Sequence, residues 1–385
     1  MKPNRKQHEL WEGVDKLFLI AIVFLLFAGI MMLASASMPI ADRDLGDPYG
    51  YVFKQSFAIV MGLISGLIIF YIPSQILEKF GIILPIIGLC LLSMVFIPDV
   101  GITVNRATRW INLGIGPNIQ VVDPARLLFL IYISGYCYRQ QKELRESFLS
   151  LLKPMIFILP ACALLLWQPD FGSTVVLLTV TAVLFFLAGF KLRYFFILIT
   201  LMAFLFSALI YMNDMRMGRI ASFMDPWSMA NDDGYQLVNS LIAIGSGGFF
   251  GVGLGEGVQK LFYLPEAHTD FIFAIIAEEL GLMGTILFLS FYSLLISRVF
   301  VIAFKAIAIE RLFQGYLCFS IGIWISIQVI INLGVNMGLL PTKGLILPLI
   351  SYGSSSMIMT LITLAIVLRI GCEIPREKIN KKINA

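Results

Sequence analysis

Ionisable side chains gather in one segment of an otherwise apolar chain, LPEAHTDFIFAIIAEELG at residues 264–281. A carboxylate inside or at the edge of a bilayer costs about 3 kcal/mol unless it is paired or faces a polar cavity. A chain that places several such groups at one helix end is therefore expected to use them. They are Glu266, His268, Asp270, Glu278 and Glu279, with Lys260 just upstream, and Glu278 and Glu279 lie deeper and are expected to be structural partners.

Asp270 is the candidate general base of this segment, and Glu266 and His268 would shape the approach to it. The alternative is that Thr269 or Asp270 only caps the following helix. The dipole of that helix would keep Asp270 ionised, which suits charge or metal binding but makes a weak base. The residues alone leave both roles open.

Two further polar clusters precede this segment. Arg109 and Trp110, within NRATRWINLGIGPNIQ (105–120), suit a phosphate and a sugar face, or a membrane–water interface. Asp123 and Arg126 are spaced i, i+3 and share a helix face, as an ion pair or as substrate contacts. Asp170, in the turn WQPDFGS (167–173), is expected to cap a helix.

A last polar cluster lies in NMGLLPTKGLILPLISYGSSSM at 336–357. Lys343 occupies a Pro-Thr-Lys-Gly turn, and Ser351 and Ser355 fall within the expected last span as candidate substrate contacts. Small hydroxyl residues are also ordinary helix-packing material in membranes. With Pro348 they indicate a broken helix that lines a cavity.

The elements that must position these residues are membrane-spanning helices. The chain of 385 residues is 59% hydrophobic and only 14% charged, whereas a soluble domain carries roughly a quarter charged residues. Its apolar blocks have the length of a bilayer helix. We therefore predict an all-α polytopic membrane protein with ten spans at about 17–37, 52–72, 81–97, 122–138, 153–167, 172–189, 193–211, 270–300, 313–337 and 345–370.

Most of the 28 Lys and Arg residues fall on the side that holds both termini, which predicts cytoplasmic termini. The predicted organisation is a cytoplasmic tail at 1–16, one transmembrane domain at 17–370 and a second tail at 371–385. An outward loop at 98–121 and a larger one at 212–269, between the seventh and eighth spans, then face outside. Within the larger loop, 235–257 is expected to be a short interfacial helix followed by a tight glycine-rich turn.

Several function classes are excluded or disfavoured. The net charge of +4 gives no reason to expect nucleic acid, and no Walker loop or GxGxxG fingerprint is present. The five cysteines form no CxxC pair and favour structural thiols. Outward cations and acids around an apolar, membrane-embedded site suit a lipid that carries a phosphate and a polar head.

Four blocks resemble the SEDS proteins (shape, elongation, division and sporulation), a family that includes FtsW, RodA and SpoVE. They are NRATRWINLG, WQPDFGS, the stretch from GYQLVNSLIAIGSGG to FIFAIIAEELG, and LPTKGLILPLISYGSSS, in family order. LPTKG and LPEAHTDFIFA resemble FtsW members more than RodA members. The family's essential Asp falls on Asp270, its Arg-Trp pair on Arg109 and Trp110, and its Glu and Lys heading the fourth span on Asp123 and Arg126.

The resemblance implies an inverting peptidoglycan glycosyltransferase, with lipid II as donor and acceptor, in the cytoplasmic (inner) membrane at the division septum. It also implies a single-span class B penicillin-binding transpeptidase and other division proteins as partners. No cofactor is certain, although a divalent cation, Mg²⁺ or Mn²⁺, would suit a diphosphate. Two other classes stay open: a lipid II flippase or transporter, which needs a polar path across the whole membrane, and a non-catalytic division scaffold.

Overall fold

The computed structural model describes residues 13–374 except 105–106, 112–117, 147 and 213. Within them, a helix overlaps each of the ten predicted spans. These helices are α2 (Lys16–Leu45), α3 (Gly50–Tyr71), α5 (Ile83–Met94), α6 (Val122–Arg139), α8 (Leu152–Trp167), α9 (Phe171–Leu187), α10 (Leu192–Tyr211), α13 (Ile272–Ala308), α14 (Leu312–Asn336) and α15 (Ser354–Glu373). The all-α membrane fold is therefore confirmed.

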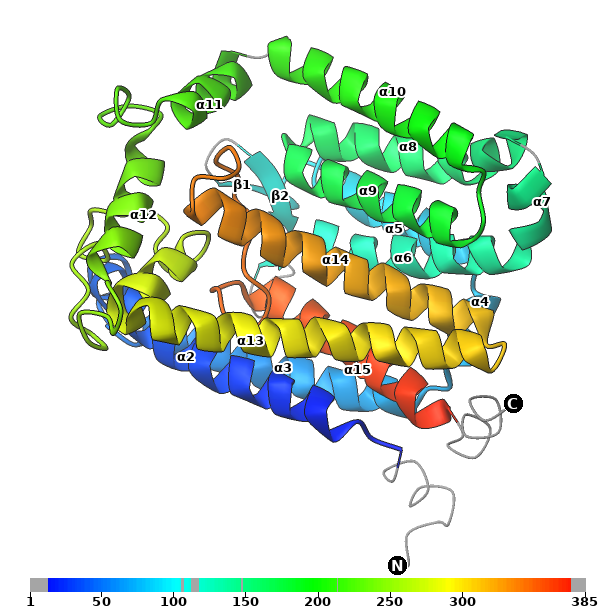
Figure 1. Cartoon of the computed structure of the whole chain (residues 1–385), viewed down its shortest axis with the longest axis horizontal. Helices are drawn as coiled ribbons and strands as arrows, with labels where there is room; N and C mark the ends of the chain where they lie inside the picture. The colour runs from blue at the N-terminus through cyan, green and yellow to red at the C-terminus, as the bar shows by residue number, and fades with distance from the viewer. Residues whose placement is uncertain (1–12, 105–106, 112–117, 147, 213, 375–385) are drawn as a thin grey trace, which may run out of the picture.

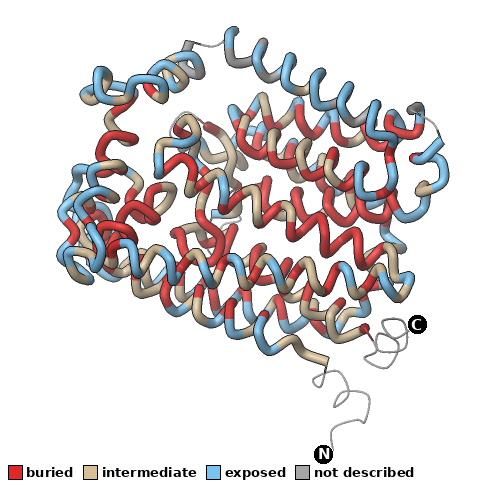
Figure 2. Tube along the Cα trace, viewed as in Figure 1, coloured by how far each residue is buried: buried red, intermediate tan, exposed pale blue. Residues whose placement is uncertain are grey.

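The helices lie side by side in one bundle with α6 and α14 at its centre (Figure 1). Most residues of α6 and of α14 are buried, and the buried part of the chain runs through the middle of the bundle (Figure 2). α3 packs on α15, and α13 packs on both α2 and α14. α10 contacts mainly α9 and α11 and lies at the edge, largely exposed.

Apolar side chains cover the outside of this bundle. Phe27 and Phe53 are 71% and 67% exposed although their helices are strongly apolar. Of the described helices, six are long and apolar enough to cross a membrane, and α5 and α9 are shorter apolar helices. Water would not solvate this surface, but lipid would. The protein therefore crosses the membrane several times.

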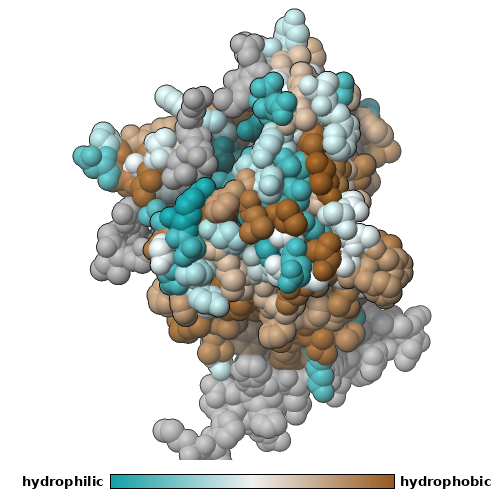
Figure 3. Space-filling model, turned by 90° about the vertical axis from the view of Figure 1, so that its left-hand side faces the viewer, coloured by the Kyte–Doolittle hydropathy of each residue, from teal (hydrophilic) through white to brown (hydrophobic). Residues whose placement is uncertain are grey.

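One end of the bundle, which we call the loop end, carries α11 (Asp214–Met224), α12 (Tyr235–Ser246) and the glycine-rich segment 247–263. The helix at 235–246 and the turn after it confirm the predicted helix and turn, whereas the interfacial position of the helix stays a prediction. Hydrophilic and hydrophobic side chains mix on the face seen from this end (Figure 3). The opposite end holds the start of α2, the end of α15, and the short helices α4 (Ser74–Lys79) and α7 (Gln141–Glu146), followed in sequence by a 3₁₀ turn at Phe148–Leu151 (Figure 1).

Three features depart from the sequence prediction. The predicted outward loop at 98–121 forms a small antiparallel sheet of β1 (Gly101–Val104), β2 (Ala107–Ile111) and β3 (Ile119–Gln120), which was not predicted. The last helix begins at Ser354 and not at 345, because 337–353 is held in a non-helical path by side chains of other helices. α13 is interrupted by Gly281, whose φ of 65° and ψ of −163° are not helical.

Candidate active site at the loop end

Asp270 lies at the loop end, two residues before α13 begins. The predicted side-chain cap is wrong: Phe271 is the N-cap residue and makes no side-chain cap hydrogen bond. Asn336 of α14 takes this role, since its Oδ1 accepts from the N–H of Ala274 at 3.2 Å. The amides of Asn336 and Asn332 donate to the main-chain oxygen of Asp270 at 3.0 and 2.9 Å. The backbone of Asp270 is therefore fixed and its carboxylate is free of capping.

The surroundings of this carboxylate make it a better base than the sequence indicates. Burial raises the pKa of Asp270 from 3.8 to about 7, and the nearby charge of Glu266 acts in the same direction. Arg109 of β2 and Arg219 of α11 oppose this shift. A group with a pKa near the working pH is suited to general-base catalysis. The expectation that the helix dipole keeps Asp270 a weak base is therefore wrong, because desolvation is the larger effect.

The segment 337–353 closes over Asp270 from the other side. A Cβ atom built on Gly344 would lie 2.6 Å from Asp270 Oδ2, so the backbone at Gly344 approaches the carboxylate closely. The segment is held by Asn332, whose Nδ2 donates to the oxygen of Leu345 at 2.6 Å, and by Gln328, whose Nε2 donates to that of Ile346 at 3.0 Å. Amides from α14 thus fix both sides of the carboxylate.

Ser351 fastens the same segment to the stretch before Asp270. Its hydroxyl donates to the oxygen of Thr269 at 2.6 Å and accepts from the N–H of Leu347 at 2.8 Å. Tyr352 donates its N–H to the oxygen of His268 at 2.9 Å. In this structure the Ser351 hydroxyl is fully used in positioning, and its proposed contact with substrate stays a prediction.

His268 and Glu266 are close to Asp270 in different ways. The ring of His268 is buried between Tyr51 and Tyr352, with centroids 4.8 and 5.8 Å away, and burial lowers its pKa. Its Nδ1 has no hydrogen-bond partner among the described residues. Glu266 accepts from the hydroxyl of Thr269 at 2.7 Å and adopts a positive φ of 55°. Both residues shape the chain that leads into Asp270.

The turn 167–173 brings three cations together. Arg109 donates from Nε to the oxygen of Gln168 at 3.1 Å and from NH2 to that of Pro169 at 2.6 Å. The ammonium of Lys343 lies 4.1 Å from the ring centroid of Phe171. Arg126 reaches the end of the turn, as described next. Cations from three distant parts of the sequence therefore converge on one short turn.

Asp123 and Arg126 are both buried on α6, where Arg126 NH1 lies 4.0 Å from Asp123 Oδ1. Arg126 NH2 donates to Ser173 Oγ at 3.3 Å, and its guanidinium lies 5.2 Å from the ring centroid of Trp324. Ser355 lies close enough to Asp123 to interact with it, yet neither Asp123 Oδ2 nor Ser355 Oγ completes a well-formed hydrogen bond within the described chain. The pair is thus loose and keeps polar capacity for a further group.

Two other predicted roles can be placed. Asp170 caps α9, accepting from the N–H of Ser173 at 3.1 Å, as predicted. Trp110 is half-buried in β2, opposite Gln120 of β3 and Ile102 of β1. Its substrate role stays a prediction.

The two deeper acids have partners in the segment 255–260. Glu278 accepts from the N–H groups of Val258 and Gln259, and Glu279 pairs with Lys260 at 2.6 Å. Their predicted role as structural partners is confirmed.

Sequence reasoning missed Gly344, Asn332 and Asn336. Each acts through a contact with a residue far away in the chain, so no local motif marks it. An Asn pair spaced i, i+4 near the end of an apolar helix was the available signal, because buried amides need partners.

The described residues do not assemble a protein-built metal site. Within the described part of the chain, no group of three or more His, Cys, Asp or Glu side chains comes together. Mg²⁺ is often held by one or two carboxylates and substrate phosphates.

The fold and site together define a multi-pass helical membrane protein with a desolvated carboxylate and several cations at one membrane face. The family model described as "Cell cycle protein", FTSW_RODA_SPOVE, matches residues 16–374. The chain belongs to this family, and the SEDS resemblance is confirmed.

Curated relatives carry the name "Probable peptidoglycan glycosyltransferase FtsW". The protein of Thioalkalivibrio sulfidiphilus is 45% identical over 364 residues, which cover 94% of this chain and 91% of that protein. That of Legionella pneumophila is 44% identical over 93% of this chain and 91% of its own length. That of Coxiella burnetii is 42% identical over 96% and 99%.

Solved structures are similar over nearly the whole chain. One is described as "Structural coordination of polymerization and crosslinking by a peptidoglycan synthase complex". It matches with a TM-score of 0.77 at 27% identity and covers 95% of this chain and 98% of that one. The rod shape determining protein RodA of Thermus thermophilus matches with a TM-score of 0.68 at 27% identity, over 94% and 98%.

Proposed function

We propose that this protein is a peptidoglycan glycosyltransferase that polymerises lipid II into glycan strands during cell division. Its family membership and its relatives' names support this activity. The observation that carries the catalytic assignment is Asp270, a carboxylate whose pKa burial raises to about 7 at the loop end. The loop end would then face outside, at the septum, with both termini in the cytoplasm, in keeping with the placement of Lys and Arg.

In the proposed reaction, Asp270 accepts the proton of the acceptor sugar's 4-hydroxyl. The hydroxyl oxygen attacks the anomeric carbon of the donor from the opposite face, and the bond to the diphosphate oxygen breaks with inversion. The lipid diphosphate leaves with the bonding electron pair. Arg109, Arg126 and Lys343, which converge on the turn 167–173, offset its negative charge.

The remaining predicted contacts take supporting places in this proposal. Trp110 would pack on a sugar face at the interface. Asp123 and Ser355 would use their unsatisfied oxygens toward polar groups of the substrate. His268 and Glu266 would shape the acceptor side. Any Mg²⁺ or Mn²⁺ would accompany the diphosphate, because no cluster of three or more His, Cys, Asp or Glu side chains comes together among the described residues.

A single-span class B penicillin-binding transpeptidase is the proposed partner. The similar structure from a peptidoglycan synthase complex, described as coordinating polymerisation and crosslinking, supports it. Other division proteins are proposed on the family resemblance.

A flippase is less well supported. A polar path would have to cross the central helices, yet α6 has no Asp, Glu, Lys or Arg between Arg126 and Arg139, and α14 has none along its length.

The test is polymerisation of purified lipid II by wild type and Asp270→Asn, each with and without the transpeptidase. We expect the variant to lose a factor of about 10² or more in rate while it folds normally. An Asp270→Asn protein that makes glycan at the wild-type rate would remove Asp270 from the mechanism. Wild type that moves lipid II across vesicles but makes no glycan would favour the flippase.

A further inference from the structure

The glycine-rich segment 248–260 is inserted into a break in α13. The backbone of Gly281, with φ of 65° and ψ of −163°, leaves the helical conformation and interrupts the helix there. Val252 and Gly253 donate instead to the oxygens of Glu278 and Glu279, at 3.0 and 3.1 Å. Leu282 and Met283 donate to the oxygens of Gly248 and Phe249, at 3.0 and 3.2 Å. The inserted segment thus replaces the connection that a continuous helix would have had.

Glycines make this insertion possible. Gly251 and Gly281 both have positive φ, of 80° and 65°. Their backbones are in contact, so a Cβ on Gly251 would collide with the backbone of α13, and a Cβ on Gly281 would collide with the backbone of the inserted segment. A Cβ on Gly257 would lie 2.9 Å from Glu279 Oε1 and 3.0 Å from Glu278 Oε2. The inserted segment therefore packs on α13 backbone against backbone, and the carboxylates of Glu278 and Glu279 lie against Gly257.

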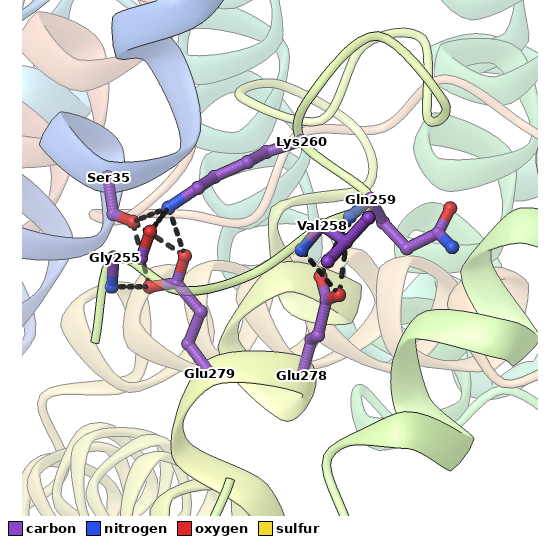
Figure 4. A network of polar contacts seen from close by, with 7 residues as sticks. All are labelled: Ser35, Gly255, Val258, Gln259, Lys260, Glu278 and Glu279. Atoms are coloured by element: carbon purple, nitrogen blue, oxygen red, sulfur yellow. Dashed lines mark hydrogen bonds and ion pairs between the residues drawn. The ribbon is translucent and has the colours of Figure 1, made fainter. Parts of the chain in front are cut away.

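A buried cluster locks the inserted segment in place (Figure 4). The ammonium of Lys260 donates to Glu279 Oε1 at 2.6 Å, to Ser35 Oγ at 2.8 Å and to the oxygen of Gly255 at 2.6 Å. Ser35 donates to both oxygens of Glu279, and Gly255 donates its N–H to Oε2 at 3.0 Å. Lys260 is 5% exposed and Glu279 is 0% exposed, so breaking this pair would leave an uncompensated buried charge.

The break divides α13 into two parts, and the outer part begins two residues after Asp270. Residues 272–279 are all buried, and a packed helical segment of this kind moves as one piece. At the Asp270 end it is held by Asn332 and Asn336 of α14. At the other end the helix ladder is interrupted, so the inserted segment and its cluster are what hold it.

We propose that the inserted segment 248–260 and its Lys260–Glu279–Ser35 cluster form a clamp that positions Asp270 by fixing the outer part of α13. Lys260 and Glu279 are then positioning residues, since they touch no reacting atom. This inference rests on the proposed function, because it assigns a catalytic consequence to the placement of Asp270.

The test compares Lys260→Met with the double variant Lys260→Met/Glu279→Met in the full-length protein. A buried ion pair can often be replaced by apolar side chains without loss of stability, so the double variant should recover the thermal stability that the single variant loses. In the double variant, however, the hydrogen bonds of Gly255 with Lys260 and Glu279 are still absent, so the inserted segment is still not fixed to α13. We expect its kcat to remain about tenfold or more below wild type, because small misplacements of a catalytic group are costly.

The pH profile separates positioning from mere stability. Asp270 is faced by Glu266 from its own segment, Arg109 from β2 and Arg219 from α11. A loosened outer part of α13 would let water reach the carboxylate and lower its pKa. The acid limb of kcat/KM should then move to lower pH in the double variant. A variant that only reduced the amount of folded protein would lower the rate at every pH without shifting the acid limb.

Asp15→Asn is the matched control. It breaks the pair between Asp15 and Arg298, which lies on the inner part of α13 beyond the break. We expect it to lower thermal stability and leave the acid limb unchanged. A double variant with wild-type stability, kcat and acid limb would overturn the proposal.

Hydrogen exchange of 266–280 reports on the clamp without reference to activity. It should rise in both Lys260 variants and not in Asp15→Asn. Inactive wild type, or active Asp270→Asn, would refute the proposed function, whereas unchanged exchange in the Lys260 variants would refute the clamp alone.

Discussion

Gly344→Ala should disable the reaction with little effect on the fold. The added Cβ would lie 2.6 Å from Asp270 Oδ2, whereas ordinary contact begins at 3.4 Å, so the carboxylate must move by 3.4 − 2.6 = 0.8 Å. Misplacement of a catalytic group by about 1 Å can cost about 10²-fold in rate, which is about 2.7 kcal/mol in the barrier. We therefore expect kcat for lipid II polymerisation to fall about 10²-fold.

Stability should change little in this variant, because the atom that must move is the end of a side chain and Gly344 has no positive φ. Thermal unfolding should place it within about 1 kcal/mol of wild type.

Gly245→Ala is the matched control, since a Cβ there meets nothing within 4 Å. The assay is the rate of glycan formation from purified lipid II, with unfolding measured on the same preparations. Wild-type polymerisation by a well-folded Gly344→Ala protein would show that the position of the Asp270 carboxylate does not limit the reaction.

Four further predictions follow from the same geometry. Because Asp270 has a raised pKa of about 7 and must be deprotonated to act, kcat/KM should fall about tenfold per pH unit below pH 7. Because the pKa of Asp270 is higher in the folded than in the unfolded chain, the protonated carboxyl stabilises the fold. This stabilisation is complete below about pH 4 and is lost as pH rises through 7. Asp270→Asn should therefore melt above wild type at pH 8. Arg109→Lys should lower kcat/KM about tenfold, because a single ammonium does not reproduce the planar fork with which Nε and NH2 of Arg109 donate to the oxygens of Gln168 and Pro169, and a charged hydrogen bond contributes about 1.5 kcal/mol. Asn336→Leu should lower the free energy of unfolding by about 1–3 kcal/mol, because the buried N–H of Ala274 loses its acceptor.

The pH profile, Arg109→Lys and Asn336→Leu each have a clear contrary result. A pH profile flat from 5 to 8, with chemistry limiting the rate, would mean that Asp270 is not the base. Arg109→Lys with normal kcat/KM would show that the cation's charge, and not its fork of donors, is what matters. Chemical denaturation of Asn336→Leu with an unchanged midpoint and slope would mean that another group, or water, satisfies Ala274.

The helices could be predicted because their signal is local. Apolar runs of bilayer length appear in the sequence wherever a span exists, so ten segments were located to within a few residues at most ends. The exceptions have physical causes. The segment 345–353 is apolar enough to read as helix, yet Gln328, Asn332 and Ser351 hold its backbone in another path. The small sheet at 101–120 has strands too short for a periodic pattern.

The site could be predicted in its residue types but not in its chemistry. The sequence by itself determined that carboxylates and cations are concentrated beside a membrane helix, because such groups are rare in apolar surroundings. Only the tertiary structure decided what each one does. Capping by Asn336, closure by Gly344 and burial by neighbouring helices free Asp270 from the helix end and raise its pKa. The pairing of Lys260 with Glu279 and Ser35 likewise joins residues remote in sequence. A pKa and a pairing depend on distances between distant segments, and those distances are set by packing.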